Sequence, residues 1–472
     1  MSRADLFHAL RGEIRARLSE ESLPSLAVAV AQHGEPLWEE AFGWADREAR
    51  IPATPDTLYS LASISKPITA TGLMVLHERG ELDLDRPAHD YLGDARLTAR
   101  VGDADDATLR RVANHTSGLP LHWHFFPEDE PRRRPPFRET LRRYGNLVTA
   151  PGERYQYSNL GYGVLDEVIS HVSGQSFAEF MRREVFLLLG MTRASVGVGP
   201  GLEPYAAARY APDGLRLPFY DFDHPGASAV FCSARDLLRF GMFHLQAGLP
   251  DQKPILTHAG IEEMQKPTAT CTETVGYGVG WRISDEWEGA RSVSHTGGMD
   301  GVNTILLLVP AERLAVVALC NAASSLPFDV AREVVALLVP RIAEQARRKP
   351  SPAEADGEPR PYPTLRGEWR GTVATGEAEL PLALAFHPDS DVHVRLGSQL
   401  TTLVSEPVLR DGWLTGCFAG DIGTEDANRR PYHLHLDLHH RGDVLNGALV
   451  VKSPPGVKLD SALSHWTELE RV

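Results

Sequence analysis

Hydrophobic and polar residues alternate with two different periods along this 472-residue chain, one typical of strands and one typical of helices. Runs of β-branched and aromatic residues lie near both ends of the first 345 residues, whereas apolar residues at helical spacing fill the middle. The predicted strands are 25–30, 36–43, 277–283, 292–295, 303–309 and 315–321, and the predicted helices are 4–18, 63–80, 235–246 and 328–348. This order predicts an α+β fold in which one antiparallel sheet, assembled from both ends and packed by helices, lies beside a helical lobe.

The character of the sequence changes after residue 364. Residues 346–364 contain five prolines, alternating charges and almost no apolar residues, which is typical of a linker. Short alternating runs follow at 367–373, 380–386, 392–396, 413–418, 432–438 and 444–451. Their spacing predicts a small antiparallel barrel or sandwich. We therefore expect one domain over 1–345, a proline-rich linker over 346–364 and an all-β barrel domain over 365–472.

Charge and composition narrow the range of partners. The formal net charge of −15 argues against nucleic acid and anionic membranes, because both repel an acidic surface. The N-terminal residues are charged throughout, and no run of 18 or more apolar residues occurs, so we expect a cytoplasmic protein without a membrane-spanning segment. The four cysteines form no C-x-x-C pair, and we expect no disulfide. Nothing in the sequence indicates an oligomeric state.

The strongest chemical signal is Ser63-Ile64-Ser65-Lys66, at the predicted start of a helix. A spacing of three residues is about one helical turn, so the hydroxyl and the amine can point into the same cleft. A serine hydroxyl is a poor nucleophile until a base takes its proton, and a lysine whose pKa is lowered by desolvation can be that base. Taken alone, the pattern favours an N-capping serine followed by a surface lysine.

Two further segments add matching chemistry. Tyr157-Ser158-Asn159 precedes a predicted helix. A buried tyrosine beside a lysine can relay a proton, and the asparagine amide can hold both the lysine head and a substrate carbonyl. His295-Thr296-Gly297-Gly298 ends a predicted strand, where small residues let a substrate backbone lie alongside. The backbone N–H groups of Ser63 and Gly298 are then candidates for an oxyanion hole.

In this order and at these separations, the three segments resemble the signatures of the serine β-lactamase and penicillin-binding protein superfamily. The segment 114–118, which reads NHTSG, is similar to a loop of the same family, and the resemblance extends from residue 10 to about 345. It implies a β-lactamase/transpeptidase-like domain of the class C-like branch, which includes esterases, D-aminopeptidases and D,D-peptidases. The resemblance also implies catalytic roles for Ser63, Lys66 and Tyr157, and substrate binding by Asn159, His295, Thr296, Gly297 and Gly298.

The third signature departs from that of penicillinases and cell-wall transpeptidases, which usually carry a lysine where this chain has His295. In those proteins the lysine holds the carboxylate of a β-lactam or of a peptide C-terminus, and a neutral histidine would hold it more weakly. A histidine here is similar to D-aminopeptidases and to several esterases of the family. We therefore expect little β-lactamase activity. Deacylation in this branch needs no separate glutamate, so Glu153 is given no role.

The C-terminal domain opens with Gly367-Glu368-Trp369, which is similar to the G-x-W of lipocalin barrels. Some peptidase-like members of the superfamily carry such a barrel after the catalytic domain, so the resemblance implies a lipocalin-like domain. Two roles stay open for it. It is either a lid or specificity element over the cleft, or an accessory domain that only stabilises the chain.

Two histidine-rich segments are candidates for metal binding. In residues 433–439 the polar side chains alternate with leucines, and three ligands on one straight strand rarely converge on an ion, so we expect a solvated strand face. We expect His122-Trp123-His124 to line the substrate entrance, and Tyr220 and His224 to lie near the substrate. No metal and no cofactor are expected.

The expected mechanism is two-step acyl transfer on a small-molecule or peptide substrate. Ser63 attacks, Lys66 or Tyr157 accepts its proton, Tyr157 protonates the leaving group, and water releases the acid. The expected substrates are small esters, or amides and peptides that contain D-residues. The alternatives are a penicillin-binding-protein-type peptidase or a peptide cyclase, in which an amine replaces water, a weak β-lactamase, and a non-catalytic binding sensor.

Overall fold

The computed structural model describes residues 6–342, 362–388 and 390–472, so most of the predicted linker over 346–364 lies outside the described residues. The strands of the first sheet are β1 (Ser25–Gln32), β2 (Glu35–Asp46), β3 (Ile51–Pro52), β11 (Ala269–Thr272), β12 (Val275–Tyr277), β13 (Arg282–Trp287), β14 (Ala290–Met299), β15 (Val302–Val309) and β16 (Leu314–Cys320). Their order is β11-β12-β13-β14-β15-β16-β1-β2-β3. β1 pairs antiparallel with β16, with Val28 opposite Ala318. The predicted α+β fold, with one sheet built from both ends, is confirmed.

The turn between β1 and β2 shows how local sequence sets this sheet. His33 and Gly34 both have positive φ angles, 53° and 88°. A two-residue turn of this hand matches the right-handed twist of the paired strands, and glycine adopts it without strain. The predicted hairpin is therefore confirmed.

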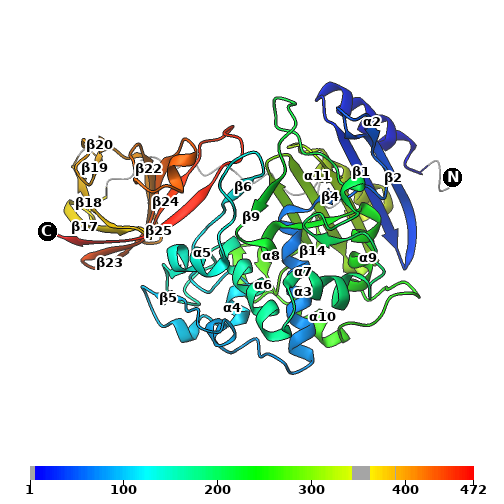
Figure 1. The fold of residues 1–472 in the computed structure, drawn as a ribbon, viewed down its shortest axis with the longest axis horizontal. Coiled ribbons are helices and arrows are strands. Elements are labelled where there is room, and N and C mark those ends of the chain that lie inside the picture. The colour runs from blue at the N-terminus through cyan, green and yellow to red at the C-terminus, as the bar shows by residue number, and fades with distance from the viewer. Residues whose placement is uncertain (1–5, 343–361, 389) are drawn as a thin grey trace.

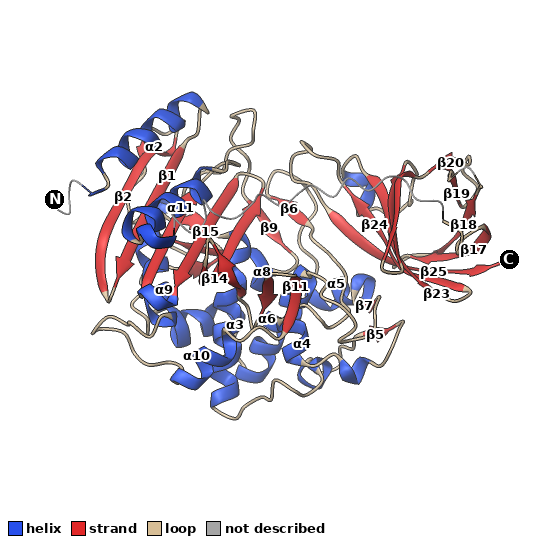
Figure 2. Cartoon of the chain, turned by 180° about the vertical axis from the view of Figure 1, so that it is seen from behind, coloured by secondary structure: helices blue, strands red, loops and turns tan. Residues whose placement is uncertain are grey.

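Helices cover both faces of the sheet (Figure 2). Side chains on one face, such as that of Val28, share a core with α2 and α11, whereas the other face, which includes Ala29, joins the core around α3 and α9. Because both faces are covered, β16 is buried at every position and reads as a continuous apolar run. The four helices are α2 (His8–Glu20), α3 (Ser65–Glu78), α9 (Ala234–His244) and α11 (Leu326–Leu338). The predicted helix 328–348 ends earlier than expected, and its residues beyond 342 lie outside the described residues.

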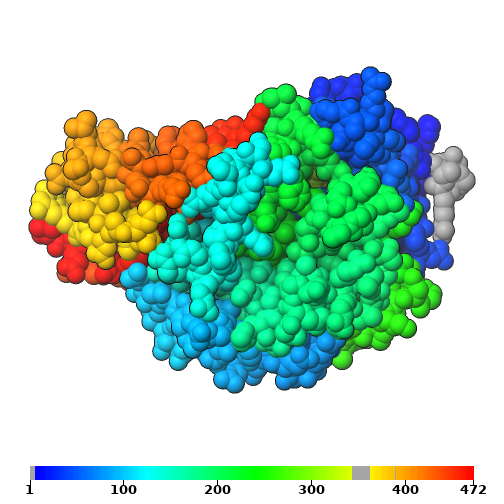
Figure 3. Space-filling view, in the orientation of Figure 1, coloured from blue at the N-terminus to red at the C-terminus, as the bar shows by residue number. Residues whose placement is uncertain are grey.

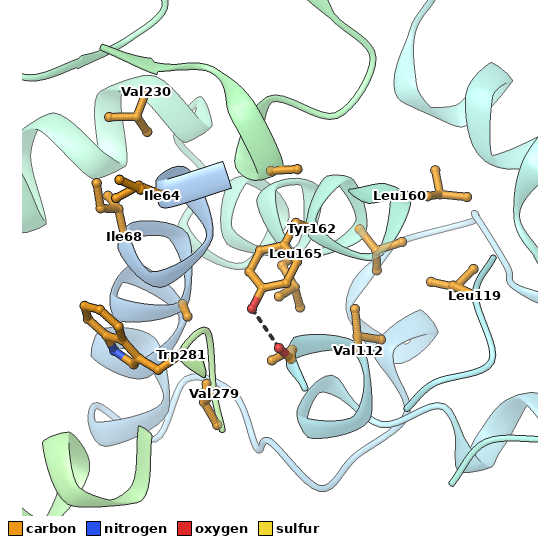
Figure 4. Packing of buried hydrophobic residues seen from close by; sticks show 14 of the residues in the cluster. Ile64, Ile68, Val112, Leu119, Leu160, Tyr162, Leu165, Val230, Val279 and Trp281 are labelled. Atoms are coloured by element: carbon orange, nitrogen blue, oxygen red, sulfur yellow. Dashed lines mark hydrogen bonds between the residues drawn. The ribbon is translucent and has the colours of Figure 1, made fainter. Parts of the chain in front are cut away.

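The helical lobe packs against α3 from the side opposite the sheet, so α3 is buried from Ser65 to Leu76. Figure 4 shows Tyr162 of this lobe, whose hydroxyl donates a hydrogen bond of 2.7 Å to the carbonyl of Ala113. The further helices are α4 (Leu109–Ala113), α5 (Phe137–Tyr144), α6 (Asn159–Ser173), α7 (Phe177–Phe180), α8 (Pro225–Ser228) and α10 (His258–Met264), and the short strands are β4 (Tyr59–Ser60), β5 (Thr98–Ala99), β6 (Phe125–Pro127), β7 (Asn146–Leu147), β8 (Ser195–Val196), β9 (Tyr220–Phe222) and β10 (Val230–Cys232). None of the described helices is both long and apolar enough to cross a bilayer.

One predicted strand is wrong. Residues 277–283 contain the last residue of β12, a tight turn and the start of β13. Gly280 in this turn has a φ of +86°, and a Cβ on Gly278 would lie 2.2 Å from the carbonyl oxygen of Met264. The two glycines permit a turn that their apolar neighbours did not suggest. As a result Tyr277 stands at the end of a strand, beside the third signature.

The C-terminal part curls into a nearly closed antiparallel barrel with the strand order β20-β19-β18-β17-β25-β24-β23-β22-β21 (Figures 1 and 2). Trp369 is fully buried in it, donates a hydrogen bond of 2.8 Å to the carbonyl of Leu365, and is covered by the guanidinium of Arg471 at 4.3 Å from the ring centroid. Its strands are β17 (Gly367–Ala374), β18 (Glu379–Phe386), β19 (Val392–Leu396), β20 (Thr402–Leu403), β21 (Ser405–Arg410), β22 (Trp413–Phe418), β23 (His433–Arg441), β24 (Val444–Lys452) and β25 (Ala462–Arg471).

β25 was not predicted, although it lies between β17 and β24 and joins the two halves of the barrel sheet. Its first six residues are buried on both faces, because one face lines the barrel and the other packs against the first part of the chain. Its last four residues are Glu468, Leu469, Glu470 and Arg471, of which only Leu469 is buried. The two-residue alternation is therefore visible only over a short stretch.

The barrel and the first part of the chain are in close contact (Figure 3). Trp123 and Ala462 pair through both backbone amides, at 2.9 and 3.0 Å. The Trp123 indole donates a hydrogen bond of 3.0 Å to Asp460, and the backbone amide of Leu459 donates to the carboxylate of Asp300. Burial, with the nearby Asp300, raises the pKa of Asp460 to about 6.

This acidic contact should make stability depend on pH. The pKa of Asp460 is raised above the ordinary value of 3.8, so the folded chain holds this proton more tightly than the unfolded chain. The protonated carboxyl of Asp460 therefore contributes to the free energy of unfolding. This contribution is fully present below pH 3.8 and is lost as the pH rises through about 6. We expect Asp460→Asn, which keeps an acceptor for Trp123, to melt a few degrees above the unmodified chain at pH 8 and at the same temperature at pH 4. Asp129→Asn, the same change at an exposed position, is the control for calorimetry; equal effects of both substitutions would contradict the assignment.

Candidate active site

Ser63 lies on a single 3₁₀ turn, Ala62–Ile64, that leads directly into α3. The structure thus places it just before the helix rather than on it. Ala62 has a φ of +48°, an uncommon conformation for a residue with a side chain, which turns the chain sharply before Ser63. On the other side, a Cβ on Gly297 would lie 2.1 Å from the carbonyl oxygen of Leu61. Glycine is therefore required for β14 to approach this turn.

Lys66 is completely buried in the first turn of α3. Its ammonium nitrogen lies 3.0 Å from Ser63 Oγ, 2.7 Å from Asn159 Oδ1 and 3.2 Å from the carbonyl oxygen of Ala227. Among the described residues these partners are neutral oxygens, and no carboxylate pairs with this lysine. Burial therefore lowers the pKa of Lys66 well below its usual 10.5.

Tyr157 completes the group predicted from sequence. Its ring centroid lies 4.7 Å from Lys66 Nζ, and its hydroxyl is hydrogen-bonded to Ser63. Burial raises the pKa of Tyr157 well above 10, and the bond to Ser63 offsets only part of this shift. The structure thus brings Ser63, Lys66, Tyr157 and Asn159 together, although they come from two segments 90 residues apart in sequence.

His295 lies at the edge of this group, and both of its ring nitrogens are already bonded. Nδ1 lies 2.8 Å from the carbonyl oxygen of Thr296, which can only accept, so Nδ1 carries the proton. Nε2 then accepts from the hydroxyl of Tyr277 at 2.9 Å. Burial lowers the pKa of His295 to about 3, and the charge of Lys66 contributes. The imidazole is neutral, and the predicted contact of His295 with substrate has no free ring nitrogen to use.

Two aromatic residues that the sequence did not single out support the site. Tyr277 fixes the tautomer of His295, and His115 packs 4.4 Å from the ring of Tyr157. His115 Nδ1 accepts from the backbone amide of Ser158 at 3.1 Å, and its carbonyl accepts from that of Gln156 at 2.7 Å. His115 thus holds the residues on both sides of Tyr157. The NHTSG motif was the available signal for His115, whereas the missed turn at 278–281 hid Tyr277.

The open edge of β14 begins at the third signature. β13 pairs with β14 only as far as Ser294, whereas β15 continues along it from His295 to Met299. Thr296 and Gly298 are exposed on this edge, and Ser63 is partly exposed. An extended substrate can therefore pair with β14 while its carbonyl reaches the hydroxyl of Ser63.

A positive charge stands near the same opening. Arg282, the first residue of β13, is exposed, and no described carboxylate pairs with it. Its charge contributes to lowering the pKa of His115 and His295, and opposes the effect of burial on the pKa of Tyr157. The site therefore has a cation beside the neutral His295.

A separate buried cluster of His122, Asp223 and His224 could hold a metal ion, because its ligand atoms lie within 4.8 Å of one another. The two imidazoles lie 2.6 and 2.5 Å from the Asp223 oxygens, which are hydrogen-bond distances. The outer ring nitrogens, His122 Nδ1 and His224 Nε2, have no partner, whereas a metal ligand usually donates its outer N–H to an acceptor. Two imidazoles that each donate one N–H to the same carboxylate fit this geometry better than a metal shell.

The other histidine predictions are wrong or only partly right. His122 and His124 are buried rather than at an entrance, and His122 instead supports the site through its carbonyl, which accepts from Asn159 Nδ2 at 3.0 Å. Tyr220 and His224 are also fully buried. The polar face of residues 433–439 is solvated only in part, because His433 is exposed whereas Asp437 contacts Arg154 of the first part of the chain.

The chain is similar to known proteins in sequence and in fold. A family model described as Beta-lactamase matches residues 10–340. The chain is 30% identical over 333 residues to penicillin-binding protein 4* of Bacillus subtilis, covering 64% of this chain and 69% of that protein. It is 27% identical over 347 residues to a D-aminopeptidase of Gluconobacter oxydans, covering 70% and 62%. An octameric penicillin-binding protein homologue from Pyrococcus abyssi has the same fold over 100% of both chains, with a TM-score of 0.62 and 20% identity.

Gly297 and Gly298 offer a matched test of this geometry. Gly297→Ala would force apart β14 and the turn that carries Ser63, at a cost of about 1–3 kcal/mol. Gly298 has open space around its Cα, so Gly298→Ala should leave the melting temperature unchanged. Thermal unfolding of the two variants checks this difference, and equal melting temperatures would show that β14 does not approach Leu61 as described.

Proposed function

The chain belongs to the beta-lactamase family and is a serine hydrolase, and we propose that Ser63 is its nucleophile and Lys66 the base that activates it. The observation that carries this proposal is the 3.0 Å separation of Lys66 Nζ from Ser63 Oγ in a buried site whose other lysine partners are neutral. A neutral amine at this distance can accept the hydroxyl proton as Ser63 attacks a carbonyl carbon.

The opposite pKa shifts divide the roles of Lys66 and Tyr157, which the sequence left open. Burial lowers the pKa of Lys66 and raises that of Tyr157, and these shifts favour a neutral amine beside a protonated phenol. Lys66 is thus suited to take the Ser63 proton, and Tyr157 to give one to the leaving group and regain it from the amine. Asn159 holds the lysine in place through its 2.7 Å bond.

The oxyanion and the acyl-enzyme are the next parts of the proposal. We assign the oxyanion hole to the backbone N–H groups of Ser63 and Gly298, the second of which lies on the open edge of β14. Water then attacks the acyl-enzyme carbonyl, and the bond to Ser63 Oγ breaks to release the acid. An amine that reached the same position would give acyl transfer instead.

The charge near the opening supports a class of substrate. His295 is neutral and fully bonded, so it cannot hold a carboxylate, but Arg282 supplies an exposed guanidinium close to Tyr157 and His295. We therefore propose amides and peptides with a carboxylate near the scissile bond as the preferred substrates. The relative named as a D-aminopeptidase supports peptides that contain D-residues. Small esters remain simple substrates for the same nucleophile.

Labelling with a fluorophosphonate tests the nucleophile. Intact-mass spectrometry should show one adduct, absent from Ser63→Ala, and Lys66→Met should slow labelling at least a hundredfold. Because a base must be deprotonated to act, the labelling rate should rise with pH through the pKa of Lys66. The lowered pKa places this rise well below pH 10.5, where an ordinary lysine would titrate, and a rise centred at or above pH 10.5 would contradict the role of Lys66 as the base. An adduct that persists in Ser63→Ala would contradict the assignment.

The role of Arg282 is tested by paired substrates. Arg282→Gln should raise the KM for a D-alanyl peptide with a free C-terminal carboxylate about tenfold, and should leave hydrolysis of its C-terminal amide and of a neutral ester unchanged. Arg291→Gln is the matched control, because Arg291 lies on the next strand and is already paired with Asp285 at 2.9 Å. Equal KM values for the carboxylate and the amide in the unmodified enzyme would refute this specificity.

A further inference from the structure

We propose that the barrel holds the loop that carries Tyr157, and that the pairing of Arg154 with Asp437 is the contact through which it does so. This inference rests on the proposed function, because it concerns how one group of the reaction is positioned. It gives the C-terminal domain a role that is neither that of a lid nor that of a passive stabiliser.

The loop in question, residues 148–158, connects β7 to α6 and contains no regular secondary structure. On its inner side it is bonded to the segment 115–118. The backbone amides of Val148, Gly152 and Gln156 donate to the carbonyls of Gly118, Thr116 and His115, at 2.9, 2.7 and 2.7 Å. These bonds fix one side of the loop. The opposite side, between Gly152 and Gln156, faces the barrel.

Arg154 is the centre of the outer contact. Its Nη2 lies 2.5 Å from Asp437 Oδ2 on β23, and its guanidinium lies 3.4 Å from the ring centroid of Trp413 on β22. The Trp413 ring stacks in turn on His439, with centroids 4.5 Å apart and planes 6° apart. Gln156 Nε2 reaches the same Asp437 oxygen at 3.4 Å. The side chain of Arg154 therefore makes both an ion pair with Asp437 and a cation–π contact with a stacked pair of rings, Trp413 and His439.

Glu153 forms the second contact. Arg441 Nη2 of β23 lies 2.6 Å from both oxygens of this carboxylate, and His439 Nδ1 lies 3.1 Å from one of them. Burial is the largest single influence on the pKa of Glu153 and would raise it, but the bonds from Arg441 and from the Ala150 amide, together with the charge of Arg441, lower the net pKa. Glu153 also accepts from the backbone amide of Ala150 at 3.0 Å, so the carboxylate joins the barrel to the start of the same turn.

These contacts are close enough to Tyr157 to affect the reaction. Tyr157 follows Arg154 by three residues and Gln156 by one, in a segment that has no helix or strand of its own to fix it. Isolated surface ion pairs contribute little, but the side chains of Arg154 and Asp437 are only 24% and 26% exposed and share their geometry with an aromatic stack. A displacement of about 1 Å at a reacting group can cost up to a hundredfold in rate.

The test uses the full chain and three variants, Arg154→Gln, Asp437→Asn and the double substitution. Each should slow the maximal rate of fluorophosphonate labelling of Ser63 about tenfold without changing the concentration that gives half of this rate, because positioning is lost and binding is not. The double variant should be no slower than either single variant, because the same contact is removed. Hydrogen exchange of peptides covering residues 148–158 should become faster in all three.

Arg143→Gln is the matched control. It removes another ion pair between the barrel and the first part of the chain, from Arg143 Nη1 to Asp426 Oδ2 at 2.8 Å, and should lower the melting temperature without changing labelling or exchange in the loop. Unchanged exchange in the Arg154 and Asp437 variants would overturn the proposal, and so would an equal loss of labelling in Arg143→Gln. Failure of the unmodified chain to label would instead refute the proposed nucleophile, while the exchange data would still decide whether the barrel holds the loop.

Discussion

The site depends on keeping one amine away from water. Lys66 is buried by the sheet on one side and the helical lobe on the other, and its hydrogen-bond partners among the described residues are neutral oxygens. An ammonium ion is costly in such surroundings, and this cost lowers the pKa of Lys66 and favours the neutral amine, the form that can accept a proton. A carboxylate beside Lys66 would stabilise the ammonium form and raise the pKa of the lysine again. The neutral His295 and the neutral amide of Asn159 fit the same requirement.

The sequence was informative wherever short-range rules apply. The turn at His33-Gly34, the three signatures and the alternation of the barrel strands follow from local spacing, and each leads to the right element. It was less informative where a residue's role depends on what packs against it from elsewhere. The place of Tyr277 depends on the turn that Gly278 and Gly280 permit between β12 and β13, and the start of β25 shows no alternation because its first six residues are buried on both faces. An alternating pattern arises only where one face of a strand is exposed to water.

The polar face of β23 shows the same limit from another side. The alternation correctly predicts that the polar side chains lie on one face of the strand. It does not show whether that face contacts water or a charged surface of the same protein. Asp437, His439 and Arg441 meet Arg154 and Glu153 there. The net charge of the chain conceals this complementarity, because it sums over residues that are paired across the two parts of the molecule.

The pairing of β1 with β16 has a consequence for how the chain is made. Val28 and Ala318 are partners in the sheet but are separated by nearly 300 residues. In the same way β17 pairs with β25, the last strand of the chain that the structure describes. Contacts of such long range form slowly, and a strand without its neighbour exposes unsatisfied amides and carbonyls. During translation the β1–β2 hairpin therefore leaves the ribosome well before its partner is synthesised. Cells that make this protein must shield that hairpin, or tolerate its aggregation, until the rest of the sheet arrives.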